Sequence, residues 1–258
     1  MHAPITFQAD QLAVRIYPSQ PAMAAAAALD VRDYLQDCLA QASEARVIFA
    51  SANSQIQFLQ AVHQLGGVDW RRITLFHMDE YLGISDQHPA SFAGFMREQV
   101  QEKFHPKEFH YLQGDASLPL TECQRYADLL SAQPIDLCCL GIGENGHLAF
   151  NDPPVADFHD PHLVKLVKLD DLCKQQQVDE GHFPSLAAVP AFAYTLTIPA
   201  LCSARKIICI VPEQRKAAAV QAALQGPVDT ACPASYLRSQ AQATLYLDAA
   251  SASGLRKR

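Results

Sequence analysis

Short apolar runs and longer segments with helical periodicity alternate along almost the whole chain. The runs predict strands at residues 46–50, 72–76, 109–112, 135–140, 194–198, 206–211 and 243–247. The segments between them predict helices over about 19–41, 54–65, 90–103, 120–132 and 213–224, with a short helix that begins at Pro233. This alternation predicts an α/β fold in which helices cover a mostly parallel, doubly wound sheet.

Residues 153–190 break this pattern. They look irregular and are rich in Pro, Asp, His and Gln, which is typical of a lid or an insertion. We find no internal repeat, low-complexity segment or domain linker, so the sequence predicts one domain over residues 1–258.

The composition is that of an ordinary globular protein, with 49% hydrophobic and 18% charged residues. The formal net charge of −7 and the lack of a dense basic stripe argue against a nucleic-acid partner. The run Ala24–Ala28 is too short to span a bilayer, and no signal peptide is visible at the N-terminus. The eight cysteines form no Cys-x-x-Cys pair, which favours free thiols in a reducing compartment. We therefore expect a soluble, cytoplasmic protein without a membrane partner.

The most informative segment follows the apolar run at 135–140. Gly141, Gly143 and Gly146 let the backbone turn sharply and approach a ligand closely. His147 stands in this turn, and imidazole is the side chain best suited to proton transfer near neutral pH. Asp152 lies five residues further on, close enough for the loop to fold it back against His147. A structural histidine is the alternative, but the glycines and the nearby carboxylate favour a functional one.

The spacing Gly141-x-Gly143-x-x-Gly146 also matches the dinucleotide-binding fingerprint. That fingerprint needs a helix immediately after its last glycine, whereas Asn151-Asp-Pro-Pro154 stops any helix soon after it begins. We therefore expect no nicotinamide or flavin cofactor. We also expect no metal site, because the segment offers no second histidine at ligand spacing.

Another predicted strand ends at two adjacent carboxylates, Asp79 and Glu80. Acidic residues at strand ends commonly cap a turn or a helix. Alternatively, one of them faces His147 across a crevice at the carboxyl edge of the sheet. Because side chains alternate along a strand, at most one of the two points into such a site, and the other braces it.

Two strand-to-helix junctions carry groups suited to an anion. Ser51, Asn53 and Ser54 come where a strand ends and a helix begins, so hydroxyl, amide and free N–H groups are available together. Lys216 begins a later helix, where a cation opposes the helix dipole, and a bound anion would explain its position. Plain N-capping and a solvated surface lysine are the alternatives.

Two of these motifs and Lys216 together resemble one protein family. The segments Phe76–Gly83 and Gly141–Pro153, with Lys216 downstream, resemble the glucosamine-6-phosphate deaminase/isomerase family. That family shares a superfamily with the 6-phosphogluconolactonases, and the sequences Met-Asp-Glu-Tyr and Ala-Phe-Asn are similar to its deaminase branch. The resemblance implies a Rossmann-like α/β fold with helices on both faces of the sheet, and no redox cofactor.

The resemblance also implies catalytic roles. Asp79 matches the base that moves a proton between C2 and C1 of the opened sugar, and His147 matches the residue that opens the pyranose ring. Asp152 and Asn145 are expected to position His147. The family usually has Asp where Asn145 stands, and often Glu where Asp152 stands. Asn lacks the negative charge that raises the basicity of histidine, but it can still orient the ring through a hydrogen bond.

For the phosphate, the resemblance implies a binding lysine at Lys216 and a phosphate loop at 51–54, which here contains no glycine. A phosphate-binding arginine of the family is replaced in the region 174–177, where Lys174 or a glutamine is expected to take its place. The residues expected to contact the substrate or its phosphate are Ser51, Asn53, Ser54, Glu80, Gly143, Gly146 and Lys216.

The sequence therefore predicts a hydrolase-type enzyme that converts an amino-sugar 6-phosphate into a ketose 6-phosphate and releases ammonia. Its partner is a small sugar phosphate. Two alternatives stay open: hydrolysis of a sugar-phosphate lactone, as in the 6-phosphogluconolactonases, and non-catalytic sensing of a sugar phosphate. The sequence leaves room for a homo-oligomer, and it fixes neither the configuration of the sugar at C4 nor any effector site.

Overall fold

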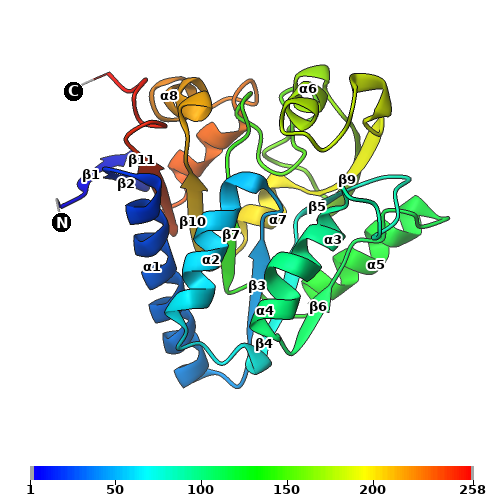
Figure 1. The fold of residues 1–258 in the computed structure, drawn as a ribbon, viewed down its shortest axis with the longest axis horizontal. Helices are drawn as coiled ribbons and strands as arrows, with labels where there is room; N and C mark the ends of the chain where they lie inside the picture. Colours follow the sequence, from blue (N-terminus) through cyan, green and yellow to red (C-terminus); the bar gives the residue numbers. More distant parts are fainter. Residues whose placement is uncertain (1–2, 257–258) are drawn as a thin grey trace.

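The computed structural model describes residues 3–256 and shows an eight-stranded sheet with helices on both faces (Figure 1). The strand order is β1-β2-β11-β10-β7-β3-β4-β6. Every neighbouring pair is parallel except the antiparallel pair β1–β2. The strands are β1 (Ile5–Ala9), β2 (Leu12–Tyr17), β3 (Ala45–Phe49), β4 (Ile73–His77), β6 (Glu108–His110), β7 (Leu137–Leu140), β10 (Lys206–Val211) and β11 (Ala243–Asp248). The predicted mostly parallel, doubly wound α/β fold is thus confirmed.

The helices are α1 (Gln20–Gln41), α2 (Ile56–Leu65), α3 (Phe92–Met96), a π-helical turn (Arg97–Gln101), α4 (Glu102–Phe104), α5 (Pro119–Ser131), α6 (Asp171–Asp179), α7 (Ile198–Cys202) and α8 (Ala217–Gln225). Short 3₁₀ turns lie at Asn53–Gln55, Trp70–Arg72, Leu186–Ala188, Gln214–Lys216 and Pro233–Ser239.

The central strands are buried on both sides, and their alternating side chains enter two separate cores. Val47 and Phe49 of β3 pack into the core beneath α1, α2 and α4, whereas Ile48 between them packs into the core beneath α5, α7 and α8.

The longest helix, α1, begins where the sequence predicts. The Ser19 hydroxyl accepts a hydrogen bond from the backbone N–H of Ala22 at 3.4 Å, and Pro21 lies in the first turn. Although α1 is 22 residues long, it carries several charged side chains on its outer face. Within residues 3–256, no helix combines the length and the apolar character needed to cross a membrane.

The N-terminal hairpin formed by β1 and β2 was not predicted. Its strands mix apolar and polar residues, and most of β1 is exposed at the edge of the sheet. This segment therefore lacks the continuous apolar run that marks the buried central strands. The pairing of β2 with β11 joins the two ends of the chain in one sheet.

A second, three-stranded antiparallel sheet stands above the carboxyl edge of the central sheet. It has the order β5-β9-β8 and consists of β5 (Asp79–Tyr81), β9 (Phe192–Leu196) and β8 (Val164–Lys168). Two expectations are corrected here. The strand expected at 194–198 belongs to this small sheet, and the segment 153–190 is ordered as β8 and α6 rather than irregular throughout. Apolar side chains of this segment, among them Phe183 and Val189, pack with Tyr81 in a small core of their own.

Candidate active site

One pocket lies where the order of the parallel strands reverses. The chain leaves β3 toward β4 and β6, but it leaves β7 toward β10 and β11, so β3 and β7 flank the switch point. Ligands of open α/β sheets bind outside the carboxyl ends of the strands at this position. Loops after β3, β4, β7 and β10 line the pocket with Ser51, Ser54, Gln55, Asp79, Gly141, Gly143, His147 and Lys216.

The segment around α6 also lines the pocket, in part with residues that the sequence did not single out. Its lining residues are Gln176, Gln177, Glu180 and His182, and Phe92 and Phe150 also line the pocket. Gln176 accepts a hydrogen bond from the backbone N–H of Glu144, which joins α6 to the loop that contains Gly141, Gly143 and Gly146, here called the glycine loop. Gln176 and Gln177 lie in the region 174–177, where Lys174 or a glutamine was expected in place of an arginine. No specific sequence signal marked Glu180 and His182, because their contacts with the other loops are distant along the chain.

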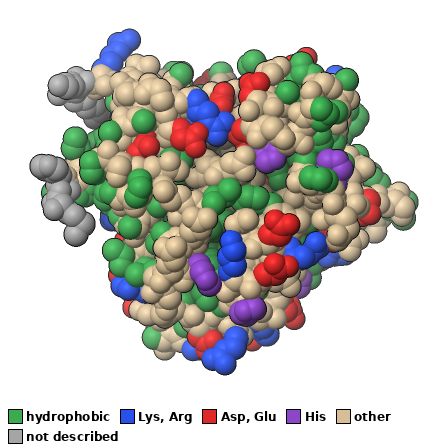
Figure 2. All heavy atoms as spheres, in the orientation of Figure 1, with side chains coloured by type: hydrophobic (Ala, Val, Ile, Leu, Met, Phe, Trp, Pro, Cys, Tyr) green, Lys and Arg blue, Asp and Glu red, His purple; other side chains and the backbone are tan. Residues whose placement is uncertain are grey.

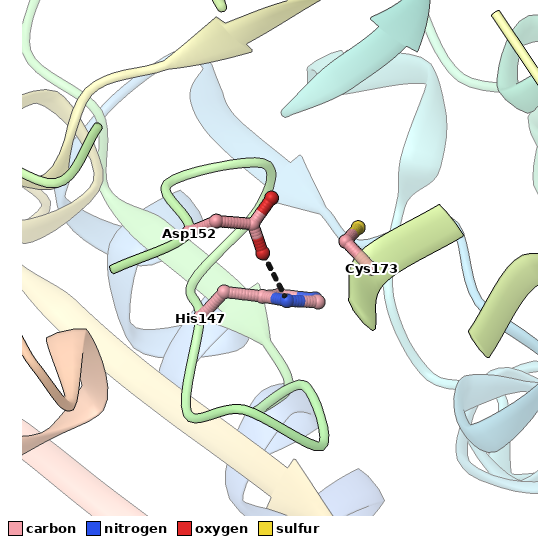
Figure 3. Close-up of side chains that lie close together, drawn as sticks. All are labelled: His147, Asp152 and Cys173. Atoms are coloured by element: carbon pink, nitrogen blue, oxygen red, sulfur yellow. Dashed lines mark ion pairs between the residues drawn. The ribbon is translucent and has the colours of Figure 1, made fainter. Parts of the chain in front are cut away.

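The predicted meeting of His147 and Asp152 occurs. His147 Nδ1 lies 2.9 Å from Asp152 Oδ1 (Figure 3). The loop is folded back by Gly146, whose φ is +86°, by Ala149, whose φ is +52°, and by a bridge between Leu148 and Asn151. Burial opposes ionisation of Asp152, but its contacts with His147 and Asn145 outweigh burial and hold the pKa of this carboxyl below its ordinary value. Asp152 is therefore an anion that faces Nδ1 of His147.

Asn145 positions this pair without lining the pocket itself. Its Nδ2 donates to Asp152 Oδ1 at 2.9 Å, and its Oδ1 accepts from the backbone N–H of His147 at 3.0 Å. The side chain was expected to orient the imidazole ring directly. Instead it holds the carboxylate that faces the ring. It does so with an uncharged amide, at a position where the family usually has a second carboxylate.

Asp79 faces the pocket from the start of β5. Its carboxyl group is buried, and its Oδ1 has no hydrogen-bond partner among residues 3–256. Burial, and then the charges of Glu80 and Asp152, raise the pKa of Asp79 well above its ordinary value. A buried carboxylate with a raised pKa and a free oxygen is suited to take up and return a proton.

Glu80 points the other way, as strand alternation requires, and this corrects its expected place at the substrate. Its carboxylate accepts hydrogen bonds from the Ser91 hydroxyl and the Ala93 N–H, both at 2.8 Å, and from the Phe92 N–H at 3.1 Å. It also accepts from the N–H of Tyr81 at 2.9 Å. Glu80 thus holds the N-terminus of α3 beside β5 and does not line the pocket.

Lys216 and Ser51 both line the pocket. Lys216 is only 3% exposed, and no described residue forms an ion pair with its ammonium group. Burial and the neighbouring Arg215 lower the pKa of Lys216. The Ser51 hydroxyl is buried without a hydrogen-bond partner among the described residues. A buried ammonium and an unpartnered hydroxyl in one pocket are groups suited to an anionic ligand.

Three other expected contacts are placed differently. Asn53 does not line the pocket, and its exposed side chain lies 3.4 Å from the His182 ring. Gly146 packs against Cys232 and shapes the loop rather than the ligand surface. Lys174, expected as a substitute for the phosphate-binding arginine, is 3.5 Å from Asp171 outside the pocket.

Arg215, next to Lys216, is surrounded by acidic side chains. Figure 2 shows basic side chains flanked by acidic ones on the surface between α8 and α6. Arg215 forms ion pairs with Glu144 at 3.0 Å and with Glu213 at 2.6 Å, and a third with Glu180. It therefore connects the glycine loop, the segment after β10 and the end of α6.

One further donor lies beside His147 and Asp152. The Cys173 thiol of α6 approaches His147 and Asp152 in Figure 3, and the potential metal-binding atoms of the three residues lie within 4.8 Å of one another. All eight cysteines lie within residues 3–256 and have free thiols, and six of them are buried.

Known proteins resemble this chain in sequence and in fold. Residues 18–167 match the family described as glucosamine-6-phosphate isomerases/6-phosphogluconolactonase. A glucosamine-6-phosphate deaminase of an Exiguobacterium species is 35% identical over 186 residues, which cover 72% of this chain and 71% of the relative. The corresponding enzyme of Listeria monocytogenes is 36% identical over 186 residues, covering 72% of this chain and 77% of the relative.

Among solved structures, a monomeric glucosamine-6-phosphate deaminase superimposes with a TM-score of 0.83 and 26% identity, covering 94% of this chain and 99% of that one. A 6-phosphogluconolactonase of Thermotoga maritima superimposes with a TM-score of 0.73 and 18% identity, covering 91% and 98% of the two chains. At that identity the second comparison shows a shared fold.

Proposed function

The chain belongs to the family of glucosamine-6-phosphate isomerases and 6-phosphogluconolactonases, and we propose that it acts as a glucosamine-6-phosphate deaminase. The observation that carries this proposal is that Asp79, His147 and Lys216 line one pocket. A proton-transfer carboxylate, an imidazole paired with a carboxylate, and an isolated buried cation are the groups that this reaction requires at one substrate.

Lys216 would bind the phosphate together with the hydroxyls of Ser51 and Ser54. His182 and Gln177 line the same pocket and are the described side chains best placed to do the work of the missing arginine. Binding of the phosphate fixes the sugar at the end remote from the reaction, and this binding energy orients C1 and C2.

His147 would open the pyranose ring. Its imidazole moves a proton from the C1 hydroxyl to the ring oxygen, which breaks the C1–O bond of the ring and leaves an aldehyde at C1. Asp152 stabilises the imidazolium formed in this step, because its carboxylate lies 2.9 Å from Nδ1. Such a positioned acid–base group accelerates the reaction by about 10²–10⁴-fold.

Asp79 would carry out the isomerisation. It removes the proton on C2 and returns it to C1, while the amino nitrogen loses one proton and the C1 oxygen gains one. The carbon that bears the amino group is thereby oxidised to an imine, and C1 is reduced to an alcohol. Water then hydrolyses the imine, which leaves a ketose 6-phosphate and releases ammonia. The name hydrolase refers to this cleavage of the C–N bond.

Asp79, His147 and Lys216 line one pocket of the same chain, and we propose that one chain forms a complete active site, although the sequence leaves room for a homo-oligomer. The solved deaminase named above is described as monomeric. Free thiols are typical of proteins in a reducing compartment, so we place the proposed reaction in the cytoplasm.

The direct test is to incubate the protein with glucosamine 6-phosphate and to measure ammonia and fructose 6-phosphate. The proposal expects both products in equal amounts. Acid release from 6-phosphogluconolactone without ammonia release would instead support a lactonase. Binding of hexosamine phosphates in calorimetry without any product would support a sensor. Galactosamine 6-phosphate as a second substrate tests which configuration at C4 the pocket accepts.

A further inference from the structure

We propose that His147, Asp152 and Cys173 form a binding site for a divalent transition-metal cation of the zinc type, and that occupation of this site removes His147 from catalysis. The three side chains come from two separate segments: His147 and Asp152 from the loop after β7, and Cys173 from α6 (Figure 3). Their donor atoms lie within 4.8 Å of one another. Such a cluster is compact enough to be spanned by one ion.

The chemistry of the donors selects the ion. An imidazole nitrogen, a carboxylate oxygen and a thiolate sulfur together suit Zn²⁺, whereas Mg²⁺ and Ca²⁺ prefer oxygen ligands alone. Three protein ligands leave a fourth tetrahedral position free. Because His147 lines the substrate pocket, that position is open to water or to a ligand in the pocket.

One atom of the cluster lacks a partner, which is a second and independent indication. Asp152 is fully buried, and its Oδ2 has no hydrogen-bond partner among the described residues. An unsatisfied buried carboxylate oxygen is costly, and a bound cation would remove that cost.

Cys173 is buried in α6 beside the Asp152 carboxylate. A metal ion that binds there replaces the thiol proton, which passes to the solvent, and its positive charge offsets the two negative charges brought together at Asp152 and Cys173.

Binding of the ion has a clear consequence for the proposed reaction. The nitrogen that faces Asp152 is Nδ1. An imidazole that coordinates a cation through Nδ1 can no longer take up a proton at Nε2 and become an imidazolium, so the occupied enzyme would not open the ring. The ion would also join α6 to the loop after β7 and hold the cover of the pocket in place. The site is thus an inhibitory one.

The first experiment uses the whole protein, freed of metal by a chelator, with no sugar present. Titration with Zn²⁺ in a calorimeter is expected to show one saturable site. Addition of Co²⁺ is expected to produce a sulfur-to-cobalt charge-transfer absorption in the near ultraviolet, which reports a thiolate ligand. No saturable binding, or binding without this absorption, would overturn the proposal. Because the readout needs no turnover, it is independent of the proposed deaminase activity.

Variants identify the thiolate. Cys173→Ser is expected to lower the affinity for Zn²⁺ by about tenfold or more and to abolish the charge-transfer absorption. Cys173→Ala should do the same, and circular dichroism confirms that each variant is folded. Cys38→Ser, a half-buried thiol in α1 outside the pocket, is the matched control and should leave both signals unchanged. Wild-type affinity in both Cys173 variants, or loss of the absorption in Cys38→Ser, would refute the assignment.

Inhibition is measured last, on an active preparation. One equivalent of Zn²⁺ is expected to suppress ammonia release by the wild-type enzyme, and the Cys173→Ser enzyme is expected to need about tenfold more Zn²⁺ for the same loss. Full activity of the wild-type enzyme with Zn²⁺ bound would contradict the inhibitory role.

Discussion

The backbone of Gly143 lies directly against the ring of His147. A Cβ atom at Gly143 would lie 2.2 Å from both Cε1 and Nε2 of this ring and 2.4 Å from Cδ2. These nearly equal distances show that the imidazole presents its face to the Gly143 backbone. The Gly143 N–H also donates to the His147 carbonyl at 3.0 Å. The glycine loop thus holds the imidazole by close contact on one side and by Asp152 at Nδ1.

Gly143→Ala is therefore expected to abolish most of the activity without unfolding the protein. The new methyl group overlaps the ring, which is the end of a movable side chain, so His147 swings away from Asp152 while the backbone stays in place. Loss of a positioned acid–base group lowers kcat by about 10²–10⁴-fold. Steady-state kinetics and thermal unfolding measured together check this. A variant with wild-type kcat would show that the position of the ring does not matter.

Asp79→Asn is expected to abolish turnover and to leave binding of the sugar phosphate intact, because the amide cannot accept the C2 proton. It should also raise the midpoint of thermal unfolding at neutral pH. Folding raises the pKa of Asp79, so its ionised form destabilises the folded state above that pKa, and the neutral amide removes the penalty. Ammonia assays, calorimetry with glucosamine 6-phosphate and thermal unfolding test the three parts.

The neighbouring carboxylate provides the contrast. Glu80→Ala leaves the hydroxyl and three N–H groups that it binds without their acceptor, at a cost of about 3 kcal/mol or more in the free energy of unfolding. Asp128→Asn is the matched control for Asp79→Asn, because it makes the same change on the exposed surface of α5. It should change neither activity nor stability. Equal losses of stability in Asp79→Asn and Glu80→Ala would contradict the different roles assigned to them.

The parts of the site that the sequence predicted are close together along the chain or follow from local geometry. His147 and Asp152 belong to one glycine-containing loop, so their contact follows from a turn. The opposite directions of Asp79 and Glu80 follow from strand alternation. Parallel strands that end at one edge bring Lys216 to the same pocket, because each β-strand in such a sheet places its following loop there.

The parts that the sequence did not predict depend on contacts between distant segments. Cys173 reaches Asp152 through α6, a short polar helix that has no clear apolar face. Strand β5 is three residues long and is a strand only because β9, more than a hundred residues later, pairs with it. Neither β5 nor α6 has a local hydrophobic period, so a search for such periods in the sequence interprets both segments as loops.

Lys216→Met is expected to raise KM for glucosamine 6-phosphate by about 30-fold or more, which corresponds to about 2 kcal/mol for a buried charge pair. The effect on kcat should be smaller, because Lys216 would contact the phosphate rather than the reacting carbons. Thermal stability should be kept or increased, since the ammonium is buried without a carboxylate partner among the described residues. Lys103→Met, outside the pocket, is the control. An unchanged KM in Lys216→Met would exclude a phosphate contact.

The pH dependence of kcat/KM should be bell-shaped. Asp79 must be ionised to remove the C2 proton, so activity falls as the pH drops through its raised pKa, at a higher pH than for an ordinary aspartate. Lys216 must be charged to bind phosphate, so activity falls on the alkaline side as the pH rises through its lowered pKa. The Lys216→Met enzyme should lose the alkaline limb of its profile and keep the acidic limb. Retention of both limbs would assign the alkaline group to another residue.

Arg215 neutralises an acidic side chain beside Lys216. Burial raises the pKa of Glu180, but its bonds with His182 and Arg215 outweigh burial and lower it to about 2, so Glu180 is an anion beside Lys216. While Arg215 is present, its guanidinium neutralises that anion. In Arg215→Gln the anion is uncompensated and repels the phosphate, and KM should rise about tenfold.

Adding Glu180→Gln to the Arg215→Gln variant is expected to restore KM, because the charge that repels the phosphate is then absent as well. The single Glu180→Gln variant should keep a KM at or below the wild-type value. The coupling free energy from this double-variant cycle is expected to be about 1–2 kcal/mol. If Arg215 contacted the phosphate directly, the double variant would be as impaired as Arg215→Gln alone, so the cycle separates neutralisation of Glu180 from direct phosphate binding.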